Sequence, residues 1–204
     1  MTSKKTKILA VGDIHGDVDL VKRLAKKAKE EHVDLVILAG DLTLAELSTK
    51  NLIGPFAKEK KQVLIIPGNH ESVATTDFLA EMYDNAKSIH GYSFSKDNIG
   101  IFGAGGADIG PNMVSESDIF NLLKKGHERI KSQEKQIMVT HMHPKGSRAE
   151  FSGFEGSQAI RKAIYEFHPD ILINAHIHEA SGIEEKIGKT KVINVSRKAK
   201  IFEI

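Results

Sequence analysis

The sequence predicts an α/β protein, and three observations lead to that prediction. Short apolar runs of Ile, Leu and Val stop at Gly, Pro or a polar residue, as buried strands of an α/β sheet do. Segments with apolar residues at helical spacing lie between these runs. The 204 residues are 40% hydrophobic and 27% charged, an ordinary globular composition. We therefore expect residues 1–204 to form a single domain.

The first half of the chain alternates expected strands with expected helices. Apolar runs and, later, polar-apolar alternation predict strands at residues 7–12, 35–39, 63–66, 88–95 and 99–103, the last two forming a hairpin. Apolar residues recurring every three or four positions predict helices at residues 18–31, within 44–60 and at 75–85.

The second half continues the same pattern and adds two long connections. Strands are expected at residues 137–140, 171–174, 186–195 and 200–204. Helices are expected at residues 116–129 and 157–167, where Ser157 is a suitable N-cap. The irregular segments 103–115 and 141–156 are long for a compact domain, so we expect them to be functional.

Composition excludes several classes of function. The 29 Lys and Arg nearly balance the 27 Asp and Glu, which leaves no basic field for nucleic acid. The absence of cysteine rules out thiolate nucleophiles, iron–sulfur clusters and cysteine zinc sites. The first apolar run ends at Asp13, and no later stretch is long enough to cross a membrane. We expect a cytoplasmic protein without membrane partners, and the composition neither requires nor excludes a homo-oligomer.

Residues able to bind metal follow five of the predicted strands. These residues are Asp13, Asp41, Asn69, His141 and His176. In open α/β sheets ligands collect at the carboxyl ends of strands, so residues far apart in the sequence can converge there. His15 and His178 each stand two positions after one of these residues, on the same side of an extended segment. Another histidine, His70, directly follows Asn69.

The mixture of donors indicates the kind of metal. Carboxylate, amide and imidazole groups without cysteine suit Mn, Fe, Zn or a similar divalent ion. Seven donors are too many for one ion, but two ions about 3.5 to 4 Å apart use all of them and form a clamp for phosphoryl chemistry. Asp41 is the natural bridging carboxylate between the two ions.

The ordered blocks resemble the calcineurin-like metallophosphoesterase superfamily. Its patterns D-x-H, G-D, G-N-H, H and G-H-x-H are similar to the blocks that begin at Asp13, Gly40, Gly68, His141 and Ala175, respectively. The resemblance implies two mixed β-sheets flanked by helices and two divalent ions, Mn²⁺ first, with Fe, Zn, Ni or Co as alternatives. Ala175 replaces the usual glycine; a positive φ there is costly for alanine, but we expect the change to be tolerated because alanine is small.

The resemblance also implies a role for each residue. It assigns one ion to Asp13, His15, Asp41 and His178. It assigns the other ion to Asp41, Asn69, His141 and His176. In this scheme a metal-bridging hydroxide attacks phosphorus in line, and His70 orients the phosphate or protonates the leaving oxygen. The expected substrate is a small phosphorylated molecule, either a phosphodiester or a phosphomonoester.

The detailed blocks distinguish branches of the superfamily. After Asp41 the chain lacks the arginine of protein serine/threonine phosphatases, which makes that alternative less favoured. Residues 141–144 and 177–179 resemble small prokaryotic phosphoesterases and phosphodiesterases. A catalytically silent, protein-binding member of the fold is a further alternative, but the full ligand set favours an enzyme. The sequence assigns no role to three nearby basic residues: His143, which we expect to face solvent, Lys145 and Arg148.

Overall fold

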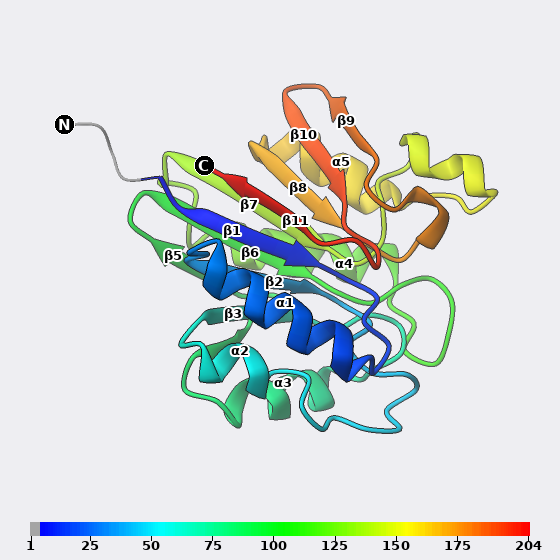
Figure 1. Cartoon of the computed structure of the whole chain (residues 1–204). Coiled ribbons are helices and arrows are strands. Elements are labelled where there is room, and N and C mark those ends of the chain that lie inside the picture. The colour runs from blue at the N-terminus through cyan, green and yellow to red at the C-terminus, as the bar shows by residue number, and fades with distance from the viewer. Residues whose placement is uncertain (1–4) are drawn as a thin grey trace.

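Two mixed β-sheets lie face to face at the centre of the molecule, and helices cover the outer face of each sheet (Figure 1). This architecture is taken from a computed structural model, which describes residues 5–204. It confirms the predicted α/β class. Within the described residues, no helix has both the length and the apolar character needed to span a membrane.

The first sheet contains, in spatial order, β11 (Lys200–Glu203), β1 (Lys7–Val11), β2 (Leu35–Ala39), β3 (Gln62–Ile66) and β4 (Ala86–Ser88). Strands β1 to β4 are parallel, whereas β11 is antiparallel to β1. The helices on its outer face are α1 (Val18–Glu30), α2 (Gly54–Lys58) and α3 (Val73–Glu81). Ser72 caps α3, so this helix begins two residues before the predicted start.

The second sheet contains, in spatial order, β5 (Ser93–Lys96), β6 (Ile99–Ala104), β7 (Lys135–Thr140), β8 (Ile171–Asn174), β10 (Thr190–Asn194) and β9 (Glu184–Ile187). Its edge strands β5 and β9 are antiparallel to their neighbours, and the four inner strands are parallel. Its outer face packs on α4 (Glu116–His127) and α5 (Gln158–Phe167). Two single-turn 3₁₀ helices are η1 (Arg148–Ser152) and η2 (His178–Ala180).

The core explains why the strands are continuous apolar runs. Along β1, Ile8 and Ala10 point into the space between the sheets, whereas Leu9 and Val11 pack against the helices. Both faces of the inner strands are therefore buried, and no polar alternation is needed. The inner strands of the two sheets end at one common edge. There Gly12 after β1 pairs with Ser196 after β10 and joins the sheets.

Two predicted strands differ from the observed ones because the chain changes direction inside them. The segment predicted at residues 88–95 is divided between β4 in the first sheet and β5 in the second. Ile89, between them, is buried between the sheets. The segment predicted at residues 186–195 contains the end of β9 and all of β10, which form a hairpin with Gly188 at positive φ in the turn.

Candidate metal centre

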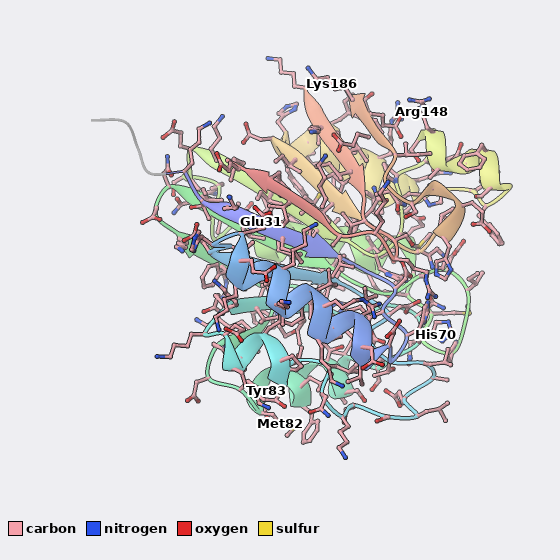
Figure 2. The ribbon with its side chains drawn as sticks, viewed as in Figure 1. Glu31, His70, Met82, Tyr83, Arg148 and Lys186 are labelled. Carbon is pink, nitrogen blue, oxygen red and sulfur yellow. The ribbon has the colours of Figure 1, made fainter. Side chains whose placement is uncertain are left out.

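All eight predicted site residues lie at the edge where the parallel strands end. Their ligand atoms form three overlapping groups, each with its atoms within 4.8 Å of one another. These groups are Asp13, His15 and His178; His15, Asp41 and His70; and Asp41, His141 and His176. Asn69 joins the third group through its contact with His141. Figure 2 shows His70 among the loops at this edge, away from Glu31 at the end of α1.

Local backbone conformation fixes several of these side chains. Asp13, His15, Asp41 and His176 have φ angles of 55°, 48°, 52° and 68°, which non-glycine residues adopt at a cost. Tertiary hydrogen bonds hold this backbone: Asp13 N donates to Gly40 O at 3.0 Å, and His15 N donates to Asp41 O at 2.9 Å. The loops after β1 and β2 therefore support each other in strained conformations, a pattern that clusters at functional sites.

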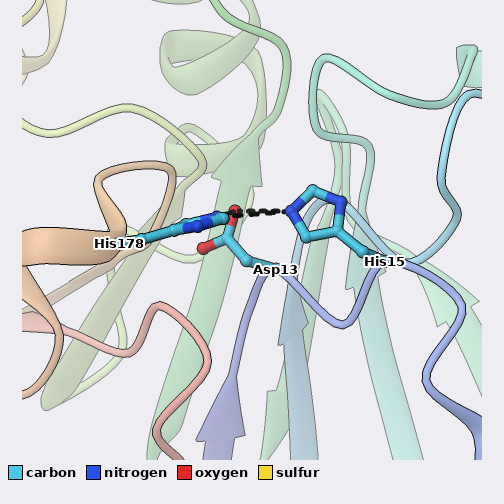
Figure 3. Close-up of side chains that lie close together, drawn as sticks. All are labelled: Asp13, His15 and His178. Atoms are coloured by element: carbon cyan, nitrogen blue, oxygen red, sulfur yellow. Dashed lines mark hydrogen bonds and ion pairs between the residues drawn. The ribbon is translucent and has the colours of Figure 1, made fainter.

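Asp13 presents one carboxylate oxygen that has no hydrogen-bond partner. Its Oδ2 accepts hydrogen bonds from His176 N, at 3.0 Å, and from the Ser196 hydroxyl. Its buried Oδ1 accepts none, and lies 3.6 Å from His178 Nε2 and 3.9 Å from His15 Nε2. Figure 3 shows the two imidazoles facing each other beside this carboxylate, with 3.3 Å between their Nε2 atoms. Burial acts to raise the pKa of Asp13, but His178, His141 and Ser196 bring it below its ordinary value.

Asp41 belongs to the second and third groups of ligand atoms and lies beside His15 of the first. Its Oδ1 accepts a hydrogen bond from His70 N at 2.9 Å. Its Oδ2 lies 3.8 Å from His15 Nε2, 3.9 Å from His70 Nε2 and 3.4 Å from His141 Nε2. Burial acts to raise the pKa of Asp41, but His141 and His70 hold it well below its ordinary value. One oxygen of Asp41 thus faces histidines from both groups.

On the opposite side of the centre, Asp41, Asn69 and His141 are buried and their acceptor atoms converge. His141 Nδ1 must carry a proton, because it lies 2.9 Å from the Ala39 carbonyl, which can only accept. His141 Nε2 then faces two further acceptors, Asn69 Oδ1 at 3.1 Å and Asp41 Oδ2 at 3.4 Å. Such an arrangement is stable with a second proton on Nε2 or with a cation among the three atoms.

The pKa values of the buried histidines agree with this interpretation. Burial acts to lower the pKa of His141, but Asp41 and Asp13 outweigh it and raise this pKa to about 9. Burial and the neighbouring His141 lower the pKa of His176 to about 4, so its imidazole is neutral and able to coordinate. Carboxylate oxygens, an amide oxygen and neutral imidazoles are donors that divalent transition metals accept. The residues present therefore fit a divalent metal.

Glu71 is a residue of the centre for which the sequence predicted no role. Its side chain is fully buried, and burial raises its pKa although backbone N–H groups act in the opposite direction. Oε1 accepts hydrogen bonds from Gly68 N at 2.8 Å and Leu42 N at 3.2 Å. Oε2 accepts from Thr43 N at 3.1 Å and from the Thr43 hydroxyl at 3.3 Å. Glu71 thus binds the loop of Asp41 to the loop of Asn69.

A glycine allows these two loops to approach each other. A Cβ on Gly68 would stand 2.0 Å from Asp41 Oδ1, a distance that no side chain can occupy. The glycine before Asn69 is therefore required for Asp41 to reach its position. Glu71 could be suspected from the sequence only because it directly follows His70 in the G-N-H-E block.

One expectation from the sequence is wrong. His143 does not face solvent: its side chain is fully buried, and neither ring nitrogen has a hydrogen-bond partner. The positive φ expected to be costly at Ala175 lies instead at His176. Ala175 is buried against Gly12, where a Cβ would come within 2.4 Å of the Ala175 Cβ. The alanine is tolerated because its partner across the sheets is a glycine.

The two basic residues without an assigned role lie outside the cluster of ligand atoms. Lys145 Nζ pairs with Glu155 at 3.1 Å. The Arg148 backbone N donates to Glu185 at 2.8 Å, and Figure 2 shows Arg148 well away from His70. Neither lines the pocket above the predicted ligands, so neither is placed to contact a substrate bound there.

A pocket of about 270 Å³ opens above the clustered side chains. Six of the eight predicted site residues line it: His15, Asp41, Asn69, His70, His176 and His178. Its mouth includes Ile109 and Phe154, one from each of the two long loops that were expected to be functional. The pocket therefore exposes the polar cluster to a small molecule.

The two-sheet architecture is the metallophosphoesterase fold. The profile of the calcineurin-like phosphoesterase family matches residues 6–180, and the chain belongs to this family. Comparison with curated protein sequences gave no match. The family and the cluster of Asp and His residues together imply that the site binds divalent metal.

Solved structures show the same fold at low sequence identity. The chain is similar to TT1561 of Thermus thermophilus, with a TM-score of 0.78, 16% identity and coverage of 98% of this chain and 99% of that one. It is similar to a structure described as a novel archaeal phosphodiesterase, with a TM-score of 0.57, 16% identity and coverage of 98% and 99%. It is also similar to a dimetal phosphatase from Danio rerio, with a TM-score of 0.62, 12% identity and coverage of 94% and 87%.

Proposed function

We propose that this protein is a phosphoesterase that uses two divalent metal ions to hydrolyse a small phosphorylated substrate. The observation that carries the proposal is the convergence of Asp41 Oδ2, Asn69 Oδ1 and His141 Nε2, an arrangement that a cation among the three atoms would satisfy as well as a second proton on His141 does. The partnerless Oδ1 of Asp13 supports it from the other side of Asp41. Two such ions would generate a nucleophile from water at neutral pH and neutralise charge on the phosphate oxygens.

Each ligand set follows one side of the cluster. We assign one ion to Asp13, His15, Asp41 and His178. We assign the second ion to Asp41, Asn69, His141 and His176. Asp41 Oδ2 is the shared ligand because it faces both sets, while Oδ1 is held by His70 N. Mn²⁺ is the proposed native ion, since a set that mixes oxygen donors with imidazole suits it.

His70 is the residue that we propose acts on the substrate rather than on the metal. Its side chain lines the pocket and lies edge-on to His15, with ring centroids 4.9 Å apart. It is about one-third exposed, so its ring can reach a phosphate oxygen bound above Asp41. There it orients the phosphate or donates a proton to the leaving oxygen. His70→Ala is expected to lower kcat by about 100-fold with both metals retained; loss of metal in this variant would make His70 a ligand.

We also propose that residues 1–204 form one phosphoesterase domain. Two strands that follow residue 180, beyond the family match, complete the central sheets: β10 pairs with β8, and β11 pairs with β1. Residues 1–4 lie outside the described part of the chain.

The first experiment compares nitrophenyl phosphate with bis(nitrophenyl) phosphate as substrates for metal-stripped protein, with and without added Mn²⁺. Metal-dependent hydrolysis of either ester is the expected result, with about two ions bound per chain by elemental analysis. Folded protein that hydrolyses neither ester with any divalent ion contradicts the proposal and favours a catalytically silent binding module.

A further inference from the structure

The mouth of the pocket combines two exposed apolar side chains with an absence of lysine and arginine among the described residues that line it. Ile109 and Phe154, here called the rim, are 43% and 52% exposed, although both are large and apolar. Of the described residues that line the pocket, none is a lysine or an arginine, and Glu179 adds a negative charge. Apolar side chains beside a few convergent polar groups are characteristic of a ligand site.

The rim residues are held in place by backbone hydrogen bonds. Asn112 N donates to the Asn69 carbonyl at 3.2 Å, so the loop that carries Ile109 is fastened to a predicted metal ligand. Gly110, with φ of +94°, packs so closely that a Cβ would stand 2.7 Å from Asn69 Nδ2. Near Phe154, Glu150 Oε1 accepts hydrogen bonds from Gly146 N at 2.8 Å and Gly156 N at 3.0 Å. Because the backbone around the rim is already fixed, less conformational entropy is lost when these side chains bind a ligand.

The charge of the lining distinguishes two kinds of phosphate. A phosphomonoester carries two negative charges near neutral pH, and proteins usually meet such a dianion with the forked donors of arginine or with lysine. The proposed metal ions would meet the phosphate oxygens of either ester, but beyond them the pocket offers neither side chain, and Glu179 at its edge repels excess negative charge. A phosphodiester carries one negative charge and has a second substituent that needs a place to lie. The rim provides an apolar place for that substituent.

We propose that the rim binds an aromatic or other apolar substituent of a phosphodiester, so that the substrate class is a diester with an apolar group on one ester oxygen. This inference deepens the proposed function and rests on it. Ile109 and Phe154 determine specificity in this proposal, and they take no part in the reaction itself.

Binding of analogues that contain no ester bond tests the proposal without turnover. Diphenylphosphinate and dimethylphosphinate both carry one negative charge, and phenylphosphonate is a dianion at alkaline pH. Calorimetry on the full, metal-loaded chain is expected to show diphenylphosphinate bound about tenfold more tightly than dimethylphosphinate, as expected for an apolar pocket. Diphenylphosphinate is also expected to bind more tightly than phenylphosphonate. Equal or tighter binding of phenylphosphonate would overturn the preference for diesters.

Substitution of the rim tests where the apolar group lies. Phe154→Ala is expected to reduce the tenfold preference for phenyl over methyl to about twofold or threefold. Phe151→Ala is the matched control, because Phe151 is 64% exposed on the neighbouring turn but does not line the pocket. Met113→Ala is the corresponding control for Ile109→Ala, since Met113 is 69% exposed and lies outside this pocket. A preference that survives Phe154→Ala and Ile109→Ala together contradicts the proposal.

Failure of this inference can be told apart from failure of the proposed function. Metal-dependent hydrolysis of nitrophenyl esters with no phenyl preference in binding overturns the rim proposal alone. A phenyl preference that Phe154→Ala removes, without hydrolysis of any ester, supports the rim and overturns the catalytic proposal.

Discussion

The floor of the pocket and its loops are built in different ways. The floor consists of the residues that follow β1, β2, β3, β7 and β8, and its contacts join positions far apart in the sequence, such as His141 with Ala39 and His176 with Asp13. The loop that carries Phe154 is held by a local carboxylate, Glu150, which accepts hydrogen bonds from Gly146 and Gly156, whereas the loop that carries Ile109 bonds to Asn69 of the floor. A change in the Phe154 loop is therefore expected to leave the floor intact. The residues of the floor and the residues of the Phe154 loop can therefore change separately.

Asp41→Asn is the largest expected disruption, and it acts on the floor. The amide that replaces the carboxylate brings less negative charge to the atom facing both histidine groups, so we expect both ions to be lost together. Activity should fall by more than about 100-fold, because the loss of a residue that only hydrogen-bonds to a metal ligand already lowers metal affinity or activity by about 10- to 100-fold. Metal content and kcat measured on the same preparation check this. Two bound ions with full activity would contradict the bridging role.

Glu71→Gln tests the support beneath the floor. A glutamine replaces one carboxylate oxygen with an NH₂ group, which cannot accept a hydrogen bond from the backbone N–H groups that now donate to Glu71. Some of the hydrogen bonds that join the Asp41 and Asn69 loops are therefore lost. We expect a loss of about 1–3 kcal/mol in the free energy of unfolding. Metal affinity should fall by about 10- to 100-fold. Thermal denaturation and metal titration measure the two effects, and a variant unchanged in both would show that Glu71 only fills space.

Glu150→Ala tests the region around the rim. Removing this carboxylate frees two backbone N–H groups beside Phe154, and exposed hydrogen bonds of this kind are worth about 0.5–1.5 kcal/mol. KM for a phenyl-substituted diester should rise by about twofold to tenfold, while kcat and metal content stay the same. Glu155→Ala, on the same loop but paired with Lys145, is the control. A fall in kcat or in metal content would show that loop and floor are coupled.

The smallest expected effect depends on pH and concerns the loop after Asp41. Ser72 N and the Thr75 hydroxyl both donate to Glu46 at 2.7 Å. The Ser72 side chain, the Thr75 hydroxyl and Ser72 N together lower the pKa of Glu46 from 4.5 to about 2. Because the folded pKa is the lower one, the stabilisation is present above the ordinary value of 4.5 and is lost as the pH falls toward 2. The effect is small because Glu46 is exposed to solvent.

The measurement for Glu46 is a difference between two proteins. The melting temperature of the unmodified chain should exceed that of Glu46→Gln at neutral pH. The difference should shrink as the pH falls below about 4.5. A difference that is the same at neutral and acidic pH would assign the effect of Glu46 to packing rather than to its charge.

Local sequence patterns were sufficient to predict the ligands because of the geometry of parallel strands. Each strand ends at the same edge of its sheet, so Asp13, Asp41 and His141 could be grouped without knowing any contact between them. The hairpin predicted from residues 88–95 and 99–103 is confirmed for β5 and β6, but the single strand at 88–95 is wrong because alternation does not reveal a change of sheet. Glu71 had no distinctive local signal, since its burial arises from the loop about 29 positions earlier in the chain.

The sequence by itself determined the α/β class, the family and the residues that follow the strands, because strand periodicity and the order of these blocks are local properties of the chain. The tertiary structure alone decided that Asp41 Oδ2 faces both histidine groups, that His143 is buried and that Ile109 and Phe154 share one pocket mouth. These features depend on loops that fold against one another across the two sheets. Such contacts join distant positions and leave no periodic pattern in the sequence.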